Sequence, residues 1–382
     1  MQYSSDRLQE FSTYAFAELN ALKKEIAKTR RVIDMGVGDP DFAPPKEIQG
    51  ALVVSLSDTE IHRYPSYQGD ISFRNSIARF FLNRYKIKLN PDINIAALIG
   101  TKEGIFHLPL ALLNSGDISA YTDPGYPVYR AGIAFAGACP IAIPIREEND
   151  FILALDKIPD GIKLLWVNYP NNPTSAVVTK DFWRELVEIA HKRGFIIAND
   201  AAYSEIYFDK PPHSLLEIPG ALDVACEFHS LSKTFCMTGW RIGFIAGNEK
   251  VISSLMTVKR YLDSGVFRAV QNAGKAGLDN YWAVSQDIRD IYAQRVQKWL
   301  DALYKAGIES MNYGTTFYIW SKIPERFESS VDFCVFLLER TGIVALPGSA
   351  MGPAGKGFVR FSMTLPDSHI DAAIVELEKI AL

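Results

Sequence analysis

The chain has 382 residues, of which 48% are hydrophobic and 22% charged. This globular composition excludes a disordered, collagen-like or coiled-coil chain. Lysine and arginine number 40 against 44 aspartate and glutamate residues, a net charge of −4, so the overall charge does not favour binding to nucleic acid or to an anionic membrane.

The cysteines and the N-terminus favour a cytoplasmic protein. Four scattered cysteines without a CxxC pair are typical of reduced, buried thiols. The first 28 residues mix charged with apolar positions and lack the apolar core of a signal peptide. No apolar run approaches the roughly 18 residues of a membrane-spanning helix. The six histidines lack metal-ligand spacing, so no metal site is expected.

Seven short apolar runs, each ending in turn residues, follow one another along the middle of the chain. They lie at 95–99, 118–121, 141–145, 164–168, 195–199, 224–228 and 242–246. Such runs, without polar alternation, are typical of strands buried on both faces. Helical patterns lie between several of them, as at 103–113 and 179–193. The alternation predicts an α/β fold with one large, mostly parallel sheet of seven strands.

The pattern changes after residue 247. Long helical stretches occupy 249–304, and a mixed α+β unit follows, strand-like at 316–320 and 358–363 and helical at 331–340 and 370–381. We therefore expect three parts. They are an N-terminal segment (1–40) that packs with the small domain, a large domain (41–285) and a small C-terminal α+β domain (286–382).

Polar side chains follow three neighbouring runs of the predicted sheet. Tyr-Pro-Asn-Asn-Pro-Thr (169–174) follows the fourth run, Asp-Ala-Ala-Tyr (200–203) the fifth, and His-Ser-Leu-Ser-Lys (229–233) the sixth. In open α/β sheets, ligands bind beyond the carboxyl ends of the strands. An amide, a carboxylate, a phenol, hydroxyls and a lysine are therefore expected at one edge of one sheet.

This set of side chains fits pyridoxal phosphate, which needs a lysine for a Schiff base and an acid opposite its ring nitrogen. Lys233 is the expected Schiff-base lysine and Asp200 the acid. Tyr203 and Asn172 are expected to bond the phenolic oxygen of the cofactor. Lys233, Asp200 and Tyr203 are the predicted catalytic residues.

The phosphate of the cofactor needs cationic and hydroxyl partners. Ser230 and Arg241 are expected to supply them, the arginine through its fork of N–H groups. Gly100, Thr101 and Lys102 end the first strand and open a helix, whose N-terminal N–H groups suit the same phosphate. The Ser230–Lys233 spacing also occurs in penicillin-binding enzymes, but no Ser-Asp-Asn or Lys-Thr-Gly follows it here.

Seven segments in one order resemble the class I aminotransferase family, pyridoxal phosphate enzymes of fold type I. They are GDPDF (38–42), YPSYQG (64–69), DPGYPVY (123–129), NNPT (171–174), DAAY (200–203), SLSKTFCMTGWRIGF (230–244) and FVRFSM (358–363). The resemblance implies transfer of an α-amino group from an amino acid to a 2-oxo acid. It further implies that Tyr126 stacks on the cofactor ring, and that Arg360, Gly38 and Asn172 bind the substrate.

The same resemblance implies a homodimer with shared sites, because Tyr64 is expected to reach the phosphate of the neighbouring subunit's cofactor. The stretches EFHSLSKTFCMTGWRIGF (227–244), DSGVFRAVQ (263–271) and YAFAELNALKKEI (14–26), with YPSYQG (64–69), resemble LL-diaminopimelate aminotransferases. That similarity implies LL-diaminopimelate as donor and 2-oxoglutarate as acceptor, in the synthesis of lysine and peptidoglycan precursors.

Four positions depart from the family pattern, and two of them are Cys236 and Met237, which stand where other residues are common. Ser175 replaces the glycine that often follows NPT, and Tyr67 stands where some diaminopimelate enzymes carry a glutamate that meets the far end of the substrate. Distal specificity therefore stays open. The alternatives are an aminotransferase for aspartate, alanine or aromatic amino acids, and a lyase on the same scaffold. A cofactor-sensing regulator would need a DNA-binding segment, for which the chain has no candidate.

Overall fold

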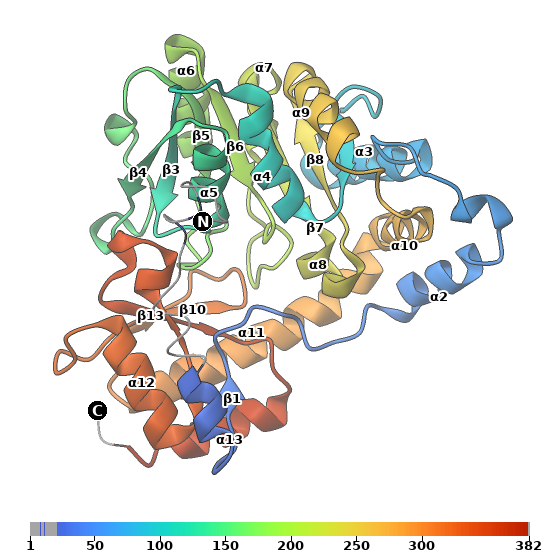
Figure 1. The fold of residues 1–382 in the computed structure, drawn as a ribbon. Helices are drawn as coiled ribbons and strands as arrows, with labels where there is room; N and C mark the ends of the chain where they lie inside the picture. Colours follow the sequence, from blue (N-terminus) through green and yellow to red (C-terminus); the bar gives the residue numbers. More distant parts are fainter. Residues whose placement is uncertain (1–7, 9–10, 12–20, 381–382) are drawn as a thin grey trace, which may run out of the picture.

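The structure is a computed structural model that describes residues 8, 11 and 21–380 (Figure 1). All seven predicted strands are present in one sheet, in the order β2-β8-β7-β6-β5-β3-β4. Their bounds are β2 Ile95–Leu98, β3 Ile118–Asp123, β4 Cys139–Pro144, β5 Ile162–Val167, β6 Ile196–Asp200, β7 Ala225–Ser230 and β8 Gly243–Gly247. Strand β8 is antiparallel to both of its neighbours, and every other pair is parallel. The predicted mostly parallel α/β sheet is confirmed.

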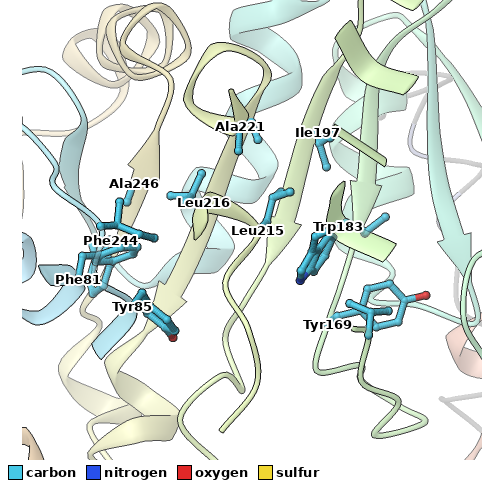
Figure 2. Close-up of a cluster of buried hydrophobic side chains, with 14 of the residues drawn as sticks. Phe81, Tyr85, Tyr169, Trp183, Ile197, Leu215, Leu216, Ala221, Phe244 and Ala246 are labelled. Carbon is cyan, nitrogen blue, oxygen red and sulfur yellow. The ribbon is translucent and has the colours of Figure 1, made fainter. Parts of the chain in front are cut away.

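Helices cover both faces of this sheet, which is why its central strands are apolar on both sides. Successive residues of β5 point to opposite faces. Trp166 packs with α4, α5 and α9, whereas Leu165 packs with α3 and α6. Figure 2 shows part of the layer that contains α3 and α6, where Phe81 of α3 lies beside Phe244 and Trp183 of α6 lies beside Tyr169. The edge strand β4 is partly exposed and carries two prolines, as edge strands tolerate.

The helices have the following bounds: α2 Lys46–Ser55, α3 Ile71–Tyr85, α4 Thr101–Leu112, α5 Val128–Phe135, α6 Lys180–Arg193, α7 Ala221–Val224, α8 Leu231–Thr234, α9 Glu249–Leu262, α10 Arg268–Asp279, α11 Tyr281–Lys305, α12 Ser330–Thr341 and α13 Asp367–Leu377. None of the helices within the described ranges is long and apolar enough to cross a membrane.

A second, antiparallel sheet lies below the first in Figure 1, in the order β12-β13-β10-β9. Its strands are β9 Ser310–Met311, β10 Tyr318–Lys322, β12 Leu346–Pro347 and β13 Phe358–Ser362. Helices α12 and α13 pack beside it, and the 25-residue helix α11 runs from the upper part to the lower. The smaller α+β unit of the fold class is therefore confirmed. The predicted boundary between residues 285 and 286 falls inside α11.

The described part of the N-terminal segment lies on this smaller unit. Strand β1 (Ile33–Asp34) pairs in parallel with β11 (Ile343–Val344). Arg30 donates from Nη1 to the carbonyl of Glu339 at 2.7 Å and pairs with Glu376 at 3.3 Å. Residues 1–7, 9–10 and 12–20 of the predicted segment, and the end of the helix predicted to residue 381, lie outside the described residues.

Candidate active site

A cavity of about 370 Å³ opens beyond the carboxyl ends of β5, β6 and β7, between the two sheets. Strands β10, β12 and β13 supply its second wall. Ten of the thirteen residues predicted for the site line it: Gly38, Thr101, Lys102, Tyr126, Asn172, Asp200, Tyr203, Ser230, Lys233 and Arg360. Asn172, Asp200, Ser230 and Lys233 meet here because each stands at or just after the carboxyl end of β5, β6 or β7, whereas Arg360 comes from the middle of β13.

Lys233 extends from α8, which begins immediately after β7. Its Nζ donates to the carbonyl oxygen of Gly38 at 2.6 Å and lies 5.7 Å from the ring centre of Phe317. Gly38 belongs to the segment that connects β1 to α2. The amine is therefore held in the cavity between the large sheet and the N-terminal segment.

Asp200 is the last residue of β6, and only 5% of its surface is exposed. One carboxylate oxygen accepts from the Tyr129 hydroxyl at 2.7 Å, and the other from the backbone N–H of Ala202 at 3.3 Å. Burial raises the pKa of Asp200 to about 6, and the bond from Tyr129 opposes this shift. A buried carboxylate with one weakly bonded oxygen suits a cationic ring nitrogen.

The phenols of Tyr126 and Tyr203 face the same space. The Tyr203 hydroxyl lies 3.0 Å from the hydroxyl of Tyr318. Burial, followed by the neighbouring Tyr318, holds the pKa of Tyr203 well above its usual range, and burial raises the pKa of Tyr126 to about 12. Both phenols therefore keep their protons at neutral pH and can act as hydrogen-bond donors.

The start of α4 forms the end of the cavity suited to an anion. Its N-cap Gly100 has a φ of 71° and supplies no side-chain cap, so the first N–H groups of the helix stay available. A Cβ at Gly100 would lie 2.4 Å from Nη2 of Arg241, so the guanidinium lies directly against this turn. Ser230, the last residue of β7, lines the same cavity. Gly100 and the exposed Arg241 are therefore neighbours of this end of the cavity but are not among its lining residues.

Arg360 lies on β13 with 6% of its surface exposed. Its Nη1 donates to Oδ1 of Asn172 at 2.6 Å, and its Nη2 donates to the carbonyl of Gly36 at 2.7 Å. Its buried Nε has no hydrogen-bond partner among the described residues. A buried cation with an unused donor is a binding group for a carboxylate.

These groups together fit pyridoxal phosphate. The free N–H groups of α4 with Arg241 suit its phosphate, Asp200 suits its ring nitrogen, and Tyr203 suits its phenolic oxygen. A Cβ at Gly100 would take the space that the Arg241 guanidinium occupies, at the end of the cavity suited to the phosphate. Lys233 lies in the same cavity as these groups and can form the covalent link.

Tyr64 lies away from the cavity of its own chain. Its side chain is 88% exposed, and it lines a separate groove with Pro65, Gly265 and Phe267. The assignment of Tyr64 to the cofactor site of a neighbouring subunit stays a prediction. Tyr67 of the same loop is also exposed.

Sequence reasoning missed the groups that support the predicted residues. Tyr129 bonds Asp200, Tyr318 bonds Tyr203, and β12 with the turn after it contributes Leu346, Ala350 and Met351 to the cavity wall. Tyr129 ends the DPGYPVY segment, a signal that could have found it. Leu346, Ala350 and Met351 carry no chemical signature.

Ser175, the departure after NPT, adopts a φ of 62°. This left-handed conformation explains why glycine is favoured there. The serine compensates through two contacts with the loop before β10. Its Oγ accepts from the N–H of Tyr313 at 2.9 Å, and its carbonyl accepts from the hydroxyl of Thr315 at 2.8 Å.

Comparisons with known proteins agree with this site. The family model of aminotransferase class I and II matches residues 30–377. LL-diaminopimelate aminotransferase of Aquifex aeolicus is 46% identical over 99% of both chains, and that of Nitratidesulfovibrio vulgaris (strain Hildenborough) is 41% identical over 98% of both. The substrate-bound BacF structure from Bacillus subtilis superimposes with a TM-score of 0.95 at 32% identity, covering 100% of this chain and 99% of the other. The chain therefore belongs to the class I and II aminotransferases, a family of enzymes that depend on pyridoxal phosphate.

Proposed function

We propose that this enzyme binds pyridoxal phosphate on Lys233 and transfers an amino group from LL-diaminopimelate to 2-oxoglutarate. The observation that carries the reaction type is the joint placement of Lys233, Asp200 and Arg360 in one cavity. The substrate choice is supported by relatives of 39–46% identity over almost the whole chain that are named LL-diaminopimelate aminotransferase. The reaction would serve the synthesis of lysine and peptidoglycan precursors.

The residues divide the work by their chemistry. Pyridoxal phosphate, when bound, withdraws electrons from the α-carbon of the substrate and carries its amino group between the two half-reactions. Arg360 holds the α-carboxylate and thereby orients the α-hydrogen. Once the amine of Lys233 is released, it removes that proton and returns it, as general base and then general acid. Asp200 keeps the ring nitrogen protonated, and Tyr203 and Asn172 donate to the phenolic oxygen.

Nearby groups keep the catalytic ones ready for these steps. Tyr129 donates to Asp200, which leaves the second carboxylate oxygen for the cofactor. Asn172 accepts from Arg360 through its oxygen, so its NH₂ group stays available as a donor. The carbonyl of Gly38 accepts from Lys233 and lies near the place proposed for the substrate carboxylate.

A homodimer with shared sites is part of the proposal. Tyr64 is almost fully exposed. Further exposed apolar side chains stand on α2 (Val53 and Val54), at the end of α9 (Tyr261 and Leu262) and just before α10 (Phe267). A partner subunit would cover these side chains and receive Tyr64 in its cofactor site. The absence of any disulfide among the four cysteines supports a cytoplasmic location.

A donor panel tests the substrate. The purified enzyme with added pyridoxal phosphate and 2-oxoglutarate is given LL-diaminopimelate, aspartate, alanine or phenylalanine, and glutamate formation is followed. We expect the highest kcat/KM with LL-diaminopimelate. A preference for aspartate, alanine or phenylalanine would keep the chemistry and overturn the substrate. Release of pyruvate and ammonia without an acceptor would indicate a lyase.

Mixing two inactive variants tests the shared site. Lys233→Ala and Tyr64→Ala chains are co-expressed, so that mixed dimers form. If Tyr64 acts across the interface, each mixed dimer contains one site with both defects and one intact site, and activity returns. Activity that stays at the level of the separate variants would place Tyr64 outside the partner's site.

A further inference from the structure

Tyr318 is a buried aromatic residue of the cavity with no role in the assignments above. It is 3% exposed and begins β10. Its hydroxyl lies 3.0 Å from that of Tyr203, and its ring centre lies 4.1 Å from the guanidinium carbon of Arg360. A Cβ at Gly38 would lie 2.0 Å from the Tyr318 hydroxyl. One side chain thus touches three residues of the proposed site.

The second sheet fixes this position. Tyr318 pairs with Ser362 and Trp320 pairs with Arg360, so Tyr318 and Arg360 are diagonal neighbours on one face of the sheet. The backbone of Tyr318 is held on both sides. Its N–H donates to Oγ1 of Thr316 at 3.0 Å, and its carbonyl accepts from Asn312 at 2.7 Å. The ring therefore has little freedom to move away from the guanidinium.

The two hydroxyls share one hydrogen bond and carry two protons. Among the described residues, each hydroxyl has the other as its hydrogen-bond partner. A charged acceptor forms hydrogen bonds about twice as strong as a neutral one. Tyr203 will therefore direct its proton to an anionic oxygen in the cavity, and its own oxygen will accept the proton of Tyr318. In this arrangement Tyr318 strengthens the donation from Tyr203.

We infer that Tyr318 is a positioning residue that links the two ends of the reaction centre, and this inference rests on the function proposed above. Its hydroxyl orients the Tyr203 proton towards the phenolic oxygen of the cofactor. Its ring holds the Arg360 guanidinium flat by a cation–π contact, with the donors of the arginine directed at the substrate carboxylate. The contact with Gly38 keeps this ring beside the segment that also accepts from Lys233.

Two substitutions separate the hydroxyl from the ring. In Tyr318→Phe the ring stays and the bond to Tyr203 is lost. Weaker donation from Tyr203 leaves more negative charge on the phenolic oxygen of the cofactor. That oxygen then holds more tightly the proton that it shares with the nitrogen linking the cofactor to Lys233. We expect the pH midpoint of the absorbance of the lysine-bound cofactor to rise by about half a unit to one unit. The KM for amino donors should change little.

In Tyr318→Leu the stacking is lost as well. The midpoint should rise as in Tyr318→Phe, and the KM for every α-amino acid donor should rise about three- to tenfold, as expected for a lost cation–π contact. Tyr313→Phe, which removes a phenol from the loop just before β10 and outside the cavity, is the matched control and should leave both quantities unchanged.

Both readouts are taken on the holoenzyme. A Tyr318→Phe enzyme that titrates like the wild type would overturn the role of the hydroxyl, whether or not Tyr318→Leu folds. An unchanged KM in folded Tyr318→Leu would overturn the role of the ring. A wild-type enzyme without a cofactor absorbance band would overturn the proposed function itself and this inference with it, so the two failures are distinguishable.

Discussion

Replacing Arg360 by alanine removes the group proposed to bind the substrate α-carboxylate. The guanidinium is buried, is bonded to Asn172 and Gly36, and has one unused donor at Nε. Losing one partner of a buried, hydrogen-bonded charge pair costs about 2–5 kcal/mol. Since about 1.4 kcal/mol corresponds to a tenfold change in rate, kcat/KM should fall by about thirty-fold to several thousand-fold.

The assay compares amino acid donors with an amine that lacks the α-carboxylate. The loss should appear with LL-diaminopimelate, glutamate and every other α-amino acid, whereas the slow reaction of the simple amine should barely change. Arg360→Lys keeps the charge without the planar fork and should recover only part of the loss. Arg340→Ala, at an exposed position near the end of α12, is the matched control.

Two results would refute this reasoning. One is an unchanged kcat/KM for α-amino acids in Arg360→Ala. The other is an equal loss for the simple amine, which would assign the effect to a distorted site. The absorbance of the bound cofactor in each variant shows whether the rest of the site is intact.

Substitutions at three further positions test the site and the structure that supports it. In the cofactor-free protein the pKa of Asp200 is about 6 against 3.8 for the ordinary carboxyl, so the folded state binds more protons in that range and its stability falls as pH rises. The free energy of unfolding of Asp200→Asn relative to wild type, measured in urea, should therefore increase by up to about 3 kcal/mol between pH about 4 and about 7, and a constant difference would contradict the assignment. Lys259 is fully buried between Glu103 (3.2 Å) and Asp263 (2.7 Å). Lys259→Met should lower the free energy of unfolding by about 3–5 kcal/mol, and an unchanged denaturation midpoint would argue against a structural ion pair. At Ser175 the left-handed backbone should make the glycine variant more stable than the alanine variant by about 1 kcal/mol in the same urea assay, whereas equal stability would mean that φ carries no strain there.

The large sheet could be predicted because its strands are short apolar runs buried on both faces. Each run was found within a few residues of its observed bounds, as for β6, predicted at 195–199 and observed at Ile196–Asp200. The residues that line the cavity on this side follow the strand ends directly. Knowing that the strands are parallel is enough to place Asn172, Asp200, Ser230 and Lys233 at one edge.

The second wall of the cavity could not be predicted in the same way. Tyr203 and Tyr318 are 115 residues apart in the chain, and their contact depends on how the two sheets pack. The position of Tyr318 beside Arg360 depends on the register of β10 with β13, which apolar patterning alone leaves undetermined. Tyr64 would require a second subunit to acquire a partner. The part of the cavity wall formed by Leu346, Ala350 and Met351 depends on the same long-range packing.

The most direct test of the account is a half-reaction without an acceptor. Purified enzyme reconstituted with pyridoxal phosphate is mixed with LL-diaminopimelate, and the absorbance of the bound cofactor is followed as it converts to its amine form. We predict fast conversion in the wild type with LL-diaminopimelate and glutamate, and none in Lys233→Ala. Fast conversion in Lys233→Ala, or the absence of a cofactor band in the wild type, would contradict the central claim that Lys233 binds the cofactor and moves the proton.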